Sequence, residues 1–336
     1  MLIVALATGD VARAQDAPPD PVPAALDAAV ANGLTFLARA QVGDGSIDGG
    51  GPKVAMTGLV VMSLLAAGHA PDVGQYGSVL RQAVDYLVTV APADGYFGKL
   101  DGSRMYGHGI VTLALAEVAG VEPDASRRAK QVAVIGRAVD VILKAQDVPK
   151  GAADADGWRY EPQSVDSDLS LSGWNVLALR AAQNAGVAVP KERVERAVRY
   201  VLKCRQQGKD GFAYQPGKDP SVAMTGVAVL NLYLLDAHAR PEVAGGVAFL
   251  TKHLPDEDQR FYYYAAYYAT QAAHQAGGDA WPAVARPTLE RLLAIQMPDG
   301  GWPQSKTGEE PGRVYSTGMA VLTLTVPYKL LPIYQR

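Results

Sequence analysis

The stretch MPDGGWPQS, from Met297 to Ser305, places an Asp-Gly-Gly-Trp turn directly after an apolar segment with helical spacing. Four similar turns occur earlier in the chain: GDGSID at Asp44, ADGYFG at Asp94, ADGWRY at Asp156 and KDGFAY at Asp210. Three of the five follow a segment that ends in glutamine, at Gln41, at Gln206–Gln207 and at Gln296, and Gln146 precedes a fourth. A motif that returns at a spacing of about 50 residues predicts a repeat of helical hairpins.

Each turn joins two segments of different character. The segment before the turn is amphipathic, and the segment after it is apolar and rich in small residues. A sixth pair, whose linker LPDEDQR lacks the glycine, fits between the fourth and the last. The first segments are Ala24–Gln41, Val79–Val90, Ala129–Gln146, Lys191–Gln207, Pro241–His253 and Ala283–Gln296. The second segments are Lys53–Gly68, Arg104–Ala119, Asp168–Ala185, Ser221–Ala237, Phe261–Ala276 and Arg313–Val326.

A step of one small or polar residue followed by glycine recurs in the second segments. It occurs as Thr57-Gly58, His108-Gly109, Ser172-Gly173, Thr225-Gly226 and Thr317-Gly318. Glycine inside a helix costs about 0.5–1 kcal/mol relative to alanine. Its repeated use therefore indicates tight packing between neighbouring helices. These segments carry almost no charge past their first turn, which predicts burial on all sides.

The pattern predicts an all-α fold, an (α/α)6 toroid of two concentric helix rings that forms a single domain over residues 24–336. Six pairs close such a ring, whereas an open array would need polar caps at both ends. The Asp-Gly turns are then structural. The glycine adopts positive φ, the carboxylate caps nearby amides, and the glutamine binds loop backbone.

Composition limits the classes of function. The chain has 336 residues, a net charge of −3 and no run of lysine or arginine, which argues against nucleic-acid binding. No apolar run approaches the roughly 20 residues of a transmembrane span. Residues 1–23 are interpreted as a signal-peptide remnant, MLIVALATG with a small-x-small site at VARA, followed by a proline-rich linker. This favours export to the periplasm or medium; the alternative is a frayed N-terminus of a cytoplasmic protein.

The Gln…Asp-Gly-(Gly/Ser)-aromatic pattern resembles the repeats of the terpenoid cyclase and protein prenyltransferase α/α-toroid superfamily. QMPDGGW and KDGFAY are the best copies, and the resemblance runs from about Ala24 to the end. The stretch FYYYAAYYATQAAHQAGGDAW and the ending LPIYQR are similar to exported bacterial proteins with prenyltransferase and squalene-oxidase repeats, which are squalene cyclase-like. The resemblance implies the fold and leaves the activity open.

Two activities of that superfamily do not match the residues. Protein prenyltransferases bind zinc through Asp, Cys and His, and the position that resembles the histidine is Ser316 here. The single cysteine, Cys204, stands in KCRQQGKDG, which also departs from the Cys-Gly-Glu-Gln of thioester domains. Because zinc needs three or four ligands, no metal and no cofactor is expected. We interpret Cys204 as a buried structural cysteine.

One motif resembles a catalytic one. Class II terpene cyclases protonate an alkene with Asp-x-Asp-Asp, and this chain has Asp166-Ser167-Asp168-Leu169. By position, Asp168 is the candidate acid and Asp166 its neighbour, because a paired, buried carboxyl group retains its proton. The third aspartate is absent. The alternative is that Asp166 or Asp168 caps the helix that follows.

Side chains near the starts of the second segments predict a lining for the axis of the ring. The candidate ligand-binding residues are Tyr106, His108, Trp174, Tyr263, Tyr267, Tyr315, Arg104 and Arg313. An aromatic-lined cavity stabilises a cation or holds a lipid. The alternatives are that tyrosines fill the axis, with their hydroxyls paired to basic residues, and that His108 is a satisfied core residue.

Three functions remain open at this stage. The first is binding of an isoprenoid or other apolar ligand, with or without a terpene cyclase-like reaction of the isomerase or lyase type. The second is a non-catalytic scaffold for an extracytoplasmic protein. The third is a secreted carbohydrate-active α/α barrel, for which Asp166, Asp168 and Asp219 are the available acids. No nucleic-acid partner is expected.

Overall fold

The computed structural model describes residues 24–336 except 207, 309–310 and 335–336; the predicted signal-peptide remnant and linker at 1–23 lie outside the described residues. Twelve α-helices and three short 3-10 helices make up the described part, with isolated bridges but no strand. The outer ring comprises α1 (Ala24–Arg39), α3 (Gly77–Thr89), α5 (Ala125–Asp147), α7 (Lys191–Lys203), α9 (Pro241–Lys252) and α11 (Ala280–Ile295). The inner ring comprises α2 (Lys53–Ala66), α4 (Arg104–Val121), α6 (Leu169–Asn184), α8 (Val222–Leu234), α10 (Tyr262–Ala276) and α12 (Arg313–Leu324).

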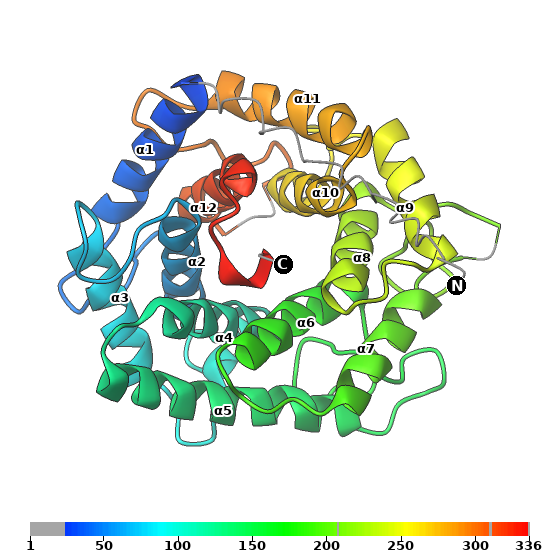
Figure 1. Cartoon of the computed structure of the whole chain (residues 1–336), viewed down its shortest axis with the longest axis horizontal. Helices are drawn as coiled ribbons and strands as arrows, with labels where there is room; N and C mark the ends of the chain where they lie inside the picture. The colour runs from blue at the N-terminus through cyan, green and yellow to red at the C-terminus, as the bar shows by residue number, and fades with distance from the viewer. Residues whose placement is uncertain (1–23, 207, 309–310, 335–336) are drawn as a thin grey trace, which may run out of the picture.

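The two rings are concentric, and Figure 1 shows the outer helices encircling the inner ones. The ring is closed, because α12 packs on both α1 and α2. Closure also has a polar link: Gln296 donates from Nε2 to the carbonyl oxygen of Ala29 at 2.8 Å, across 267 positions of sequence. The all-α toroid predicted from the repeats is confirmed.

The two rings differ in burial as their sequences predict. Every residue of α2 after Lys53 is buried, whereas α7 buries one face only, through Ala197, Val198, Tyr200 and Val201. An inner helix contacts the outer layer and two inner neighbours, so the only side of it that remains faces the axis of the ring. Among the described helices, none is both long enough and apolar enough to cross a membrane.

Each Asp-Gly turn connects an outer helix to an inner one, and the first turn also packs against the next outer helix of the ring. Gly45 has φ of +87°, and a side chain there would meet the carbonyl oxygen of Gln82 on α3 at 2.4 Å. Gln41 donates from Nε2 to the carbonyl oxygens of Gly45 and Val79, at 3.1 and 2.8 Å. One amide therefore holds its own turn and the start of α3 together. This is why the repeat keeps both the glycine and the glutamine.

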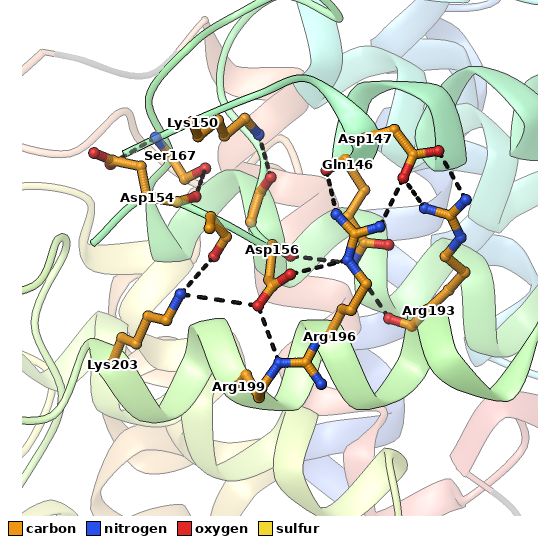
Figure 2. Close-up of polar contacts among 12 residues, drawn as sticks. Gln146, Asp147, Lys150, Asp154, Asp156, Ser167, Arg193, Arg196, Arg199 and Lys203 are labelled. Carbon is orange, nitrogen blue, oxygen red and sulfur yellow. Dashed lines mark hydrogen bonds and ion pairs between the residues drawn. The ribbon is translucent and has the colours of Figure 1, made fainter. Parts of the chain in front are cut away.

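The third turn makes the same link with more charge, as Figure 2 shows. Gln146 donates to the carbonyl oxygens of Asp156 and Arg193, at 3.0 and 3.2 Å. Here Asp156 takes the positive φ, of +80°, and its carboxylate accepts from Arg196 and Arg199 at 2.9 and 3.1 Å. The aspartate of this turn therefore binds the guanidinium groups of α7 and does not cap its own loop.

In each inner helix that has the glycine step, the residue before the glycine makes a side-chain hydrogen bond that was not predicted from the sequence. Its side chain accepts a hydrogen bond from the backbone N–H of the residue that follows the Asp-Gly turn. Thr57 accepts from Ile47, and Thr317 accepts from Trp302, at 2.9 and 3.0 Å. His108 does the same, with Nδ1 accepting from the Phe97 N–H at 3.3 Å. The step therefore fixes each turn to its inner helix.

The C-terminal segment lies in the middle of the ring, at the end where the inner helices finish (Figure 1). It contains η2 (Val326–Tyr328) and η3 (Pro332–Tyr334). The backbone N–H of Ile333 donates to Glu117 on α4 at 3.2 Å, and the hydroxyl of Tyr334 pairs with that of Tyr267 on α10. Because Ile333 and Tyr334 are buried, this segment blocks the axis at that end.

Candidate functional site: a chamber at one end of the ring

A chamber of about 790 Å³ lies at the opposite end, where all six inner helices begin. The first turns of these helices contribute most of the lining, and the loops before them contribute the rest. The wall residues used below are Met56, Tyr106, Ile110, Tyr160, Ser170, Trp174, Tyr214, Met224, Tyr264 and Tyr315. The axis is therefore hollow at one end and filled at the other.

Aromatic side chains border the chamber on its deeper side. The ring centroids of Trp174 and Tyr264 are 6.4 Å apart, and both rings also contact the buried Tyr268, at 5.8 and 4.6 Å. Tyr268 in turn contacts Tyr267, with ring centroids 5.0 Å apart, and the Tyr267 hydroxyl pairs with that of Tyr334. Met56, Ile110 and Met224 add flexible apolar surface to the wall.

The rim includes Phe261 and four residues of the linker of the sixth pair, Pro255, Asp256, Gln259 and Arg260. Phe261 caps α10 with a left-handed backbone, φ +58°, and 43% of the residue is exposed. This conformation is costly for a bulky residue, by roughly 1–3 kcal/mol. A strained, exposed aromatic side chain at the rim indicates that surrounding structure holds it at the entrance.

Asp168 lies beside the chamber but is not part of its wall. It has no exposed surface, and its Oδ1 accepts from the N–H of Leu171 at 2.8 Å, as an N-cap of α6. Its Oδ2 accepts from Arg159 at 2.8 Å and from the hydroxyl of Tyr214 at 3.0 Å. Burial raises the pKa of Asp168 to about 6, although all three donors favour the carboxylate.

Asp166 is half-exposed and pairs with Nε of Arg159 at 3.1 Å. The Arg159 guanidinium thus binds both aspartates, and it also lies over the ring of Tyr160, 4.4 Å from its centroid. The two candidate acids are therefore held by one guanidinium group behind the tyrosines of the wall. This geometry satisfies both carboxylates and aims neither at the chamber.

Substitution of Asp168 separates the two roles proposed from the sequence. Asp168→Ala should lower the free energy of unfolding by about 2–4 kcal/mol, because the buried cap and one partner of Arg159 are lost together. Asp168→Asn should cost less, about 1–3 kcal/mol, since an amide oxygen still caps the helix but the amide nitrogen cannot accept from Arg159 and Tyr214. Urea unfolding followed by circular dichroism measures both. Asp124, the exposed N-cap of α5, provides the matched control, and Asp124→Ala should cost about 1 kcal/mol. Equal stability of Asp168→Ala and the parent would rule out the cap.

Of the predicted ligand-binding residues, Tyr106, Trp174 and Tyr315 line the chamber. Tyr263 and Tyr267 differ from the expectation. Tyr263 donates to the carbonyl oxygen of Pro303 at 2.7 Å, and Tyr267 lies one turn deeper, against Tyr334. The reason is the helix period, which sends consecutive tyrosines of α10 in different directions.

The predicted basic and histidine residues also lie outside the chamber wall. His108 is fully buried, with Nε2 3.0 Å from the carbonyl oxygen of Ala138, and burial lowers its pKa to about 4. Arg313 binds the turn carboxylate of Asp299 at 2.7 Å. Arg104 pairs with Glu161 at 3.3 Å. Each is engaged by the repeat structure around it.

Sequence reasoning missed two wall residues, Tyr160 and Tyr214. Both stand three positions after the glycine of an Asp-Gly turn, in DGWRY and DGFAY. The aromatic residue nearer the glycine packs inward in each, as Trp158 and Phe212 do, and the tyrosine two positions later reaches the chamber. This shared register is a signal that the sequence contains.

Within the described part of the chain, no three His, Cys, Asp or Glu side chains gather closely enough to hold a metal ion. Cys204 is buried, and burial raises the pKa of its thiol to about 12. Such a thiol is unreactive at neutral pH. This agrees with a structural cysteine.

Comparisons with known proteins place the fold. The family profile described as the prenyltransferase alpha-alpha toroid domain matches residues 159–332, just over half of the chain. No curated protein matches the chain. An inactive variant of an alpha-1,6-mannanase from Salegentibacter sp. HEL1_6 superposes with a TM-score of 0.67 at 8% identity, over 90% of this chain and 99% of the mannanase.

Two further solved structures are similar at comparable coverage. A type II terpene cyclase variant from Scytonema, in complex with geranylgeranyl dihydroxybenzoate, has a TM-score of 0.60 and 14% identity, over 92% of this chain and 98% of that one. A glycosidase variant has a TM-score of 0.59 and 15% identity over the same shares. At these identities the likeness shows the fold alone.

Proposed function

The chain belongs to the prenyltransferase alpha-alpha toroid family, and from this premise we propose that it binds an isoprenoid or another elongated apolar molecule in the chamber. The observation that carries the proposal is the chamber itself. Its volume of about 790 Å³ falls within the roughly 300–1,000 Å³ of small-molecule sites, and aromatic and apolar side chains dominate its wall. A scaffold has no need for such a hollow.

The proposal is one of binding and assigns no reaction. Asp168 is taken as the cap of α6 and Asp166 as a partner of Arg159, for the contacts given above. The terpene cyclase from Scytonema holds a geranylgeranyl compound as its substrate. That likeness in fold, together with the aromatic wall, supports an isoprenoid as the ligand class.

The carbohydrate-active alternative has less support from the geometry. Glycosidases generally place two carboxyl groups about 5–10 Å apart across the substrate. Among the described residues that line this chamber, Asp256 is the one acid. Asp166 and Asp168 are bound to Arg159, and Asp219 pairs with Lys209 at 2.6 Å. The mannanase and glycosidase likenesses therefore support the fold and not the activity.

We propose that residues 24–336 act as one domain and that the protein works outside the cytoplasm. The second proposal is based on the sequence of residues 1–23. Cell fractionation with mass spectrometry of the mature N-terminus tests it. An intact N-terminus in the cytoplasmic fraction would favour the cytoplasmic alternative.

Filling the chamber tests the proposed function. Geranylgeraniol is titrated into the protein, and binding is measured by calorimetry and by the fluorescence of Trp174 in the wall. Ala223→Trp places a large ring in the chamber and should weaken binding at least about tenfold, because it occupies the volume of the ligand. Ala133→Trp, on the exposed face of α5, is the matched control and should bind like the parent. Equal binding by both variants, or no binding by the parent, would contradict the proposal.

A further inference from the structure

Hydroxyl groups gather on one side of the chamber. Tyr106 on α4, Ser170 on α6 and Tyr264 on α10 form one hydrogen-bonded chain, with both links at 3.0 Å. Tyr160 and Tyr214 form a second group beside it, with their hydroxyls 2.9 Å apart. All five residues line the chamber. The wall therefore has a polar side within a mostly apolar site.

The direction of the second group follows from counting protons. Tyr214 has one hydroxyl proton, which it donates to Oδ2 of Asp168, and its oxygen accepts from Arg159 at 2.9 Å. The Asp168 carboxylate also accepts from Arg159 and from the Leu171 amide, as an ionised group does. Tyr214 thus has no proton left for Tyr160. Tyr160 must donate to Tyr214, and the Tyr160 oxygen keeps lone pairs that can accept.

The first chain gives the same result. Tyr106 donates to Oγ of Ser170, and Ser170 donates onward to the hydroxyl of Tyr264. The Tyr106 oxygen has therefore used its proton and can still accept. The rings of Tyr106 and Tyr160 are neighbours, with centroids 6.0 Å apart. The hydroxyl oxygens of these two adjacent side chains can therefore both accept a hydrogen bond from a ligand on the same side of the chamber.

The charges around this polar side are already paired. Arg159 binds both Asp166 and Asp168, and Arg104 binds Glu161. The described residues that line the chamber add one charge of each sign, Arg260 and Asp256, so these residues and the pairs named above carry no excess of positive charge for a phosphate or carboxylate. An anionic head group would also face the two acceptor oxygens, with no proton of its own to offer them.

We propose that the chamber recognises an apolar ligand by a neutral hydroxyl head group, which donates its single proton to the oxygen of Tyr106 or of Tyr160. The apolar body then lies against Met56, Ile110 and Met224 on the rest of the wall. This inference rests on the proposed function and narrows it from apolar molecules in general to alcohols. It makes Tyr106 and Tyr160 the residues that determine specificity.

Three probes that share one chain test the head group: geranylgeraniol, its methyl ether and geranylgeranyl phosphate. The ether accepts hydrogen bonds but donates none. The alcohol should bind about fivefold tighter than the ether. One hydrogen bond contributes about 1 kcal/mol, which corresponds to about a fivefold difference in Kd. The phosphate should bind more weakly than the alcohol. Calorimetry at one salt concentration measures all three.

Variants assign the preference to the two tyrosines. In Tyr106→Phe, and more completely in the double variant with Tyr160→Phe, the ratio of alcohol to ether affinity should fall to about 1, with ether affinity little changed. Tyr328→Phe is the matched control, because it removes a phenol that binds Asp27 away from the chamber, and it should keep the parent ratio.

The outcomes separate this inference from the proposed function. If alcohol and ether bind equally well to the parent, or the phosphate binds best, the hydroxyl preference is wrong and apolar binding stands. If the preference persists in the double variant, other groups recognise the head and the assignment fails. If none of the probes binds, the proposed function fails and this inference with it.

Discussion

Replacing Gly226 with alanine should lower the free energy of unfolding by about 2–3 kcal/mol, even though alanine is the better helix former. Gly226 lies on the side of α8 that packs against α10. A methyl group there would come within 2.7 Å of the backbone carbon of Tyr268 and the backbone nitrogen of Ala269. Backbone atoms cannot rotate away as a side chain does, so the two helices would have to separate.

The matched control is Gly136, a helical glycine of α5 with no atom within 4 Å of the position where a methyl group would stand. Gly136→Ala should raise stability by up to about 1 kcal/mol, because it gains helix propensity without a clash. Urea unfolding of both variants measures the change in the free energy of unfolding, which should be negative for Gly226→Ala and positive for Gly136→Ala. A stabilising Gly226→Ala would show that the inner helices are less closely packed than the structure indicates.

The fold was predictable because five of the six repeats contain the same features, an Asp-Gly turn and a glycine in the helix that follows it. One Asp-Gly turn is a weak signal of a particular fold, since Asp and Gly are common in the turns of many folds. Five turns with the same glycine step after them, four of them with a glutamine before them, leave few architectures. Gln296 shows the gain: its expected role was to bind its own loop, and the structure adds the bond to Ala29 that closes the ring.

The chamber was harder to predict, because its wall depends on side-chain direction. The tyrosines of α10 are all buried, so composition alone does not show which one faces the axis. Tyr264 lines the chamber, whereas Tyr263 reaches the loop at Pro303. At the other end of the axis, the C-terminal segment around Ile333 packs against Glu117. This segment is not part of the helical repeat, so the repeat pattern did not predict its position.

The role of Asp168 shows how a motif can fit two chemistries. The sequence left an acid and a helix cap open, because an aspartate at the start of α6 can serve as either. The structure adds Arg159 and Tyr214 as partners and removes all exposure to the chamber. An acid must reach its substrate, and a cap must reach an amide. The contact with Leu171 meets the second requirement.

Glu117 predicts a pH dependence of stability with an unusual sign. The residue is 1% exposed, and among the described residues its carboxyl group accepts one hydrogen bond, from the Ile333 N–H. Burial raises its pKa from 4.5 to about 8. Between these values the folded state keeps the proton and the unfolded chain releases it. Stability contributed by this group is therefore present at low pH and lost as the pH rises towards 8.

Glu117→Gln should remove this loss, because an amide is neutral at every pH and still accepts from Ile333. At pH 8 the variant should be more stable than the parent by about 2–4 kcal/mol, since a pKa difference of one between the folded and unfolded states corresponds to about 1.4 kcal/mol. At pH 5 the two should be nearly equal. Urea unfolding at pH 5, 6.5 and 8 provides the comparison.

The difference between variant and parent isolates this carboxyl group, because other buried groups such as His108 titrate alike in both proteins. Glu290→Gln is the matched control, since that exposed side chain pairs only with Arg286 on the same helix among its described contacts, and its difference from the parent should stay flat with pH. Glu117 is covered by the C-terminal segment that blocks the axis. An advantage of Glu117→Gln that fails to grow from pH 5 to pH 8 would mean that water reaches the carboxyl group, and that this segment does not seal the ring.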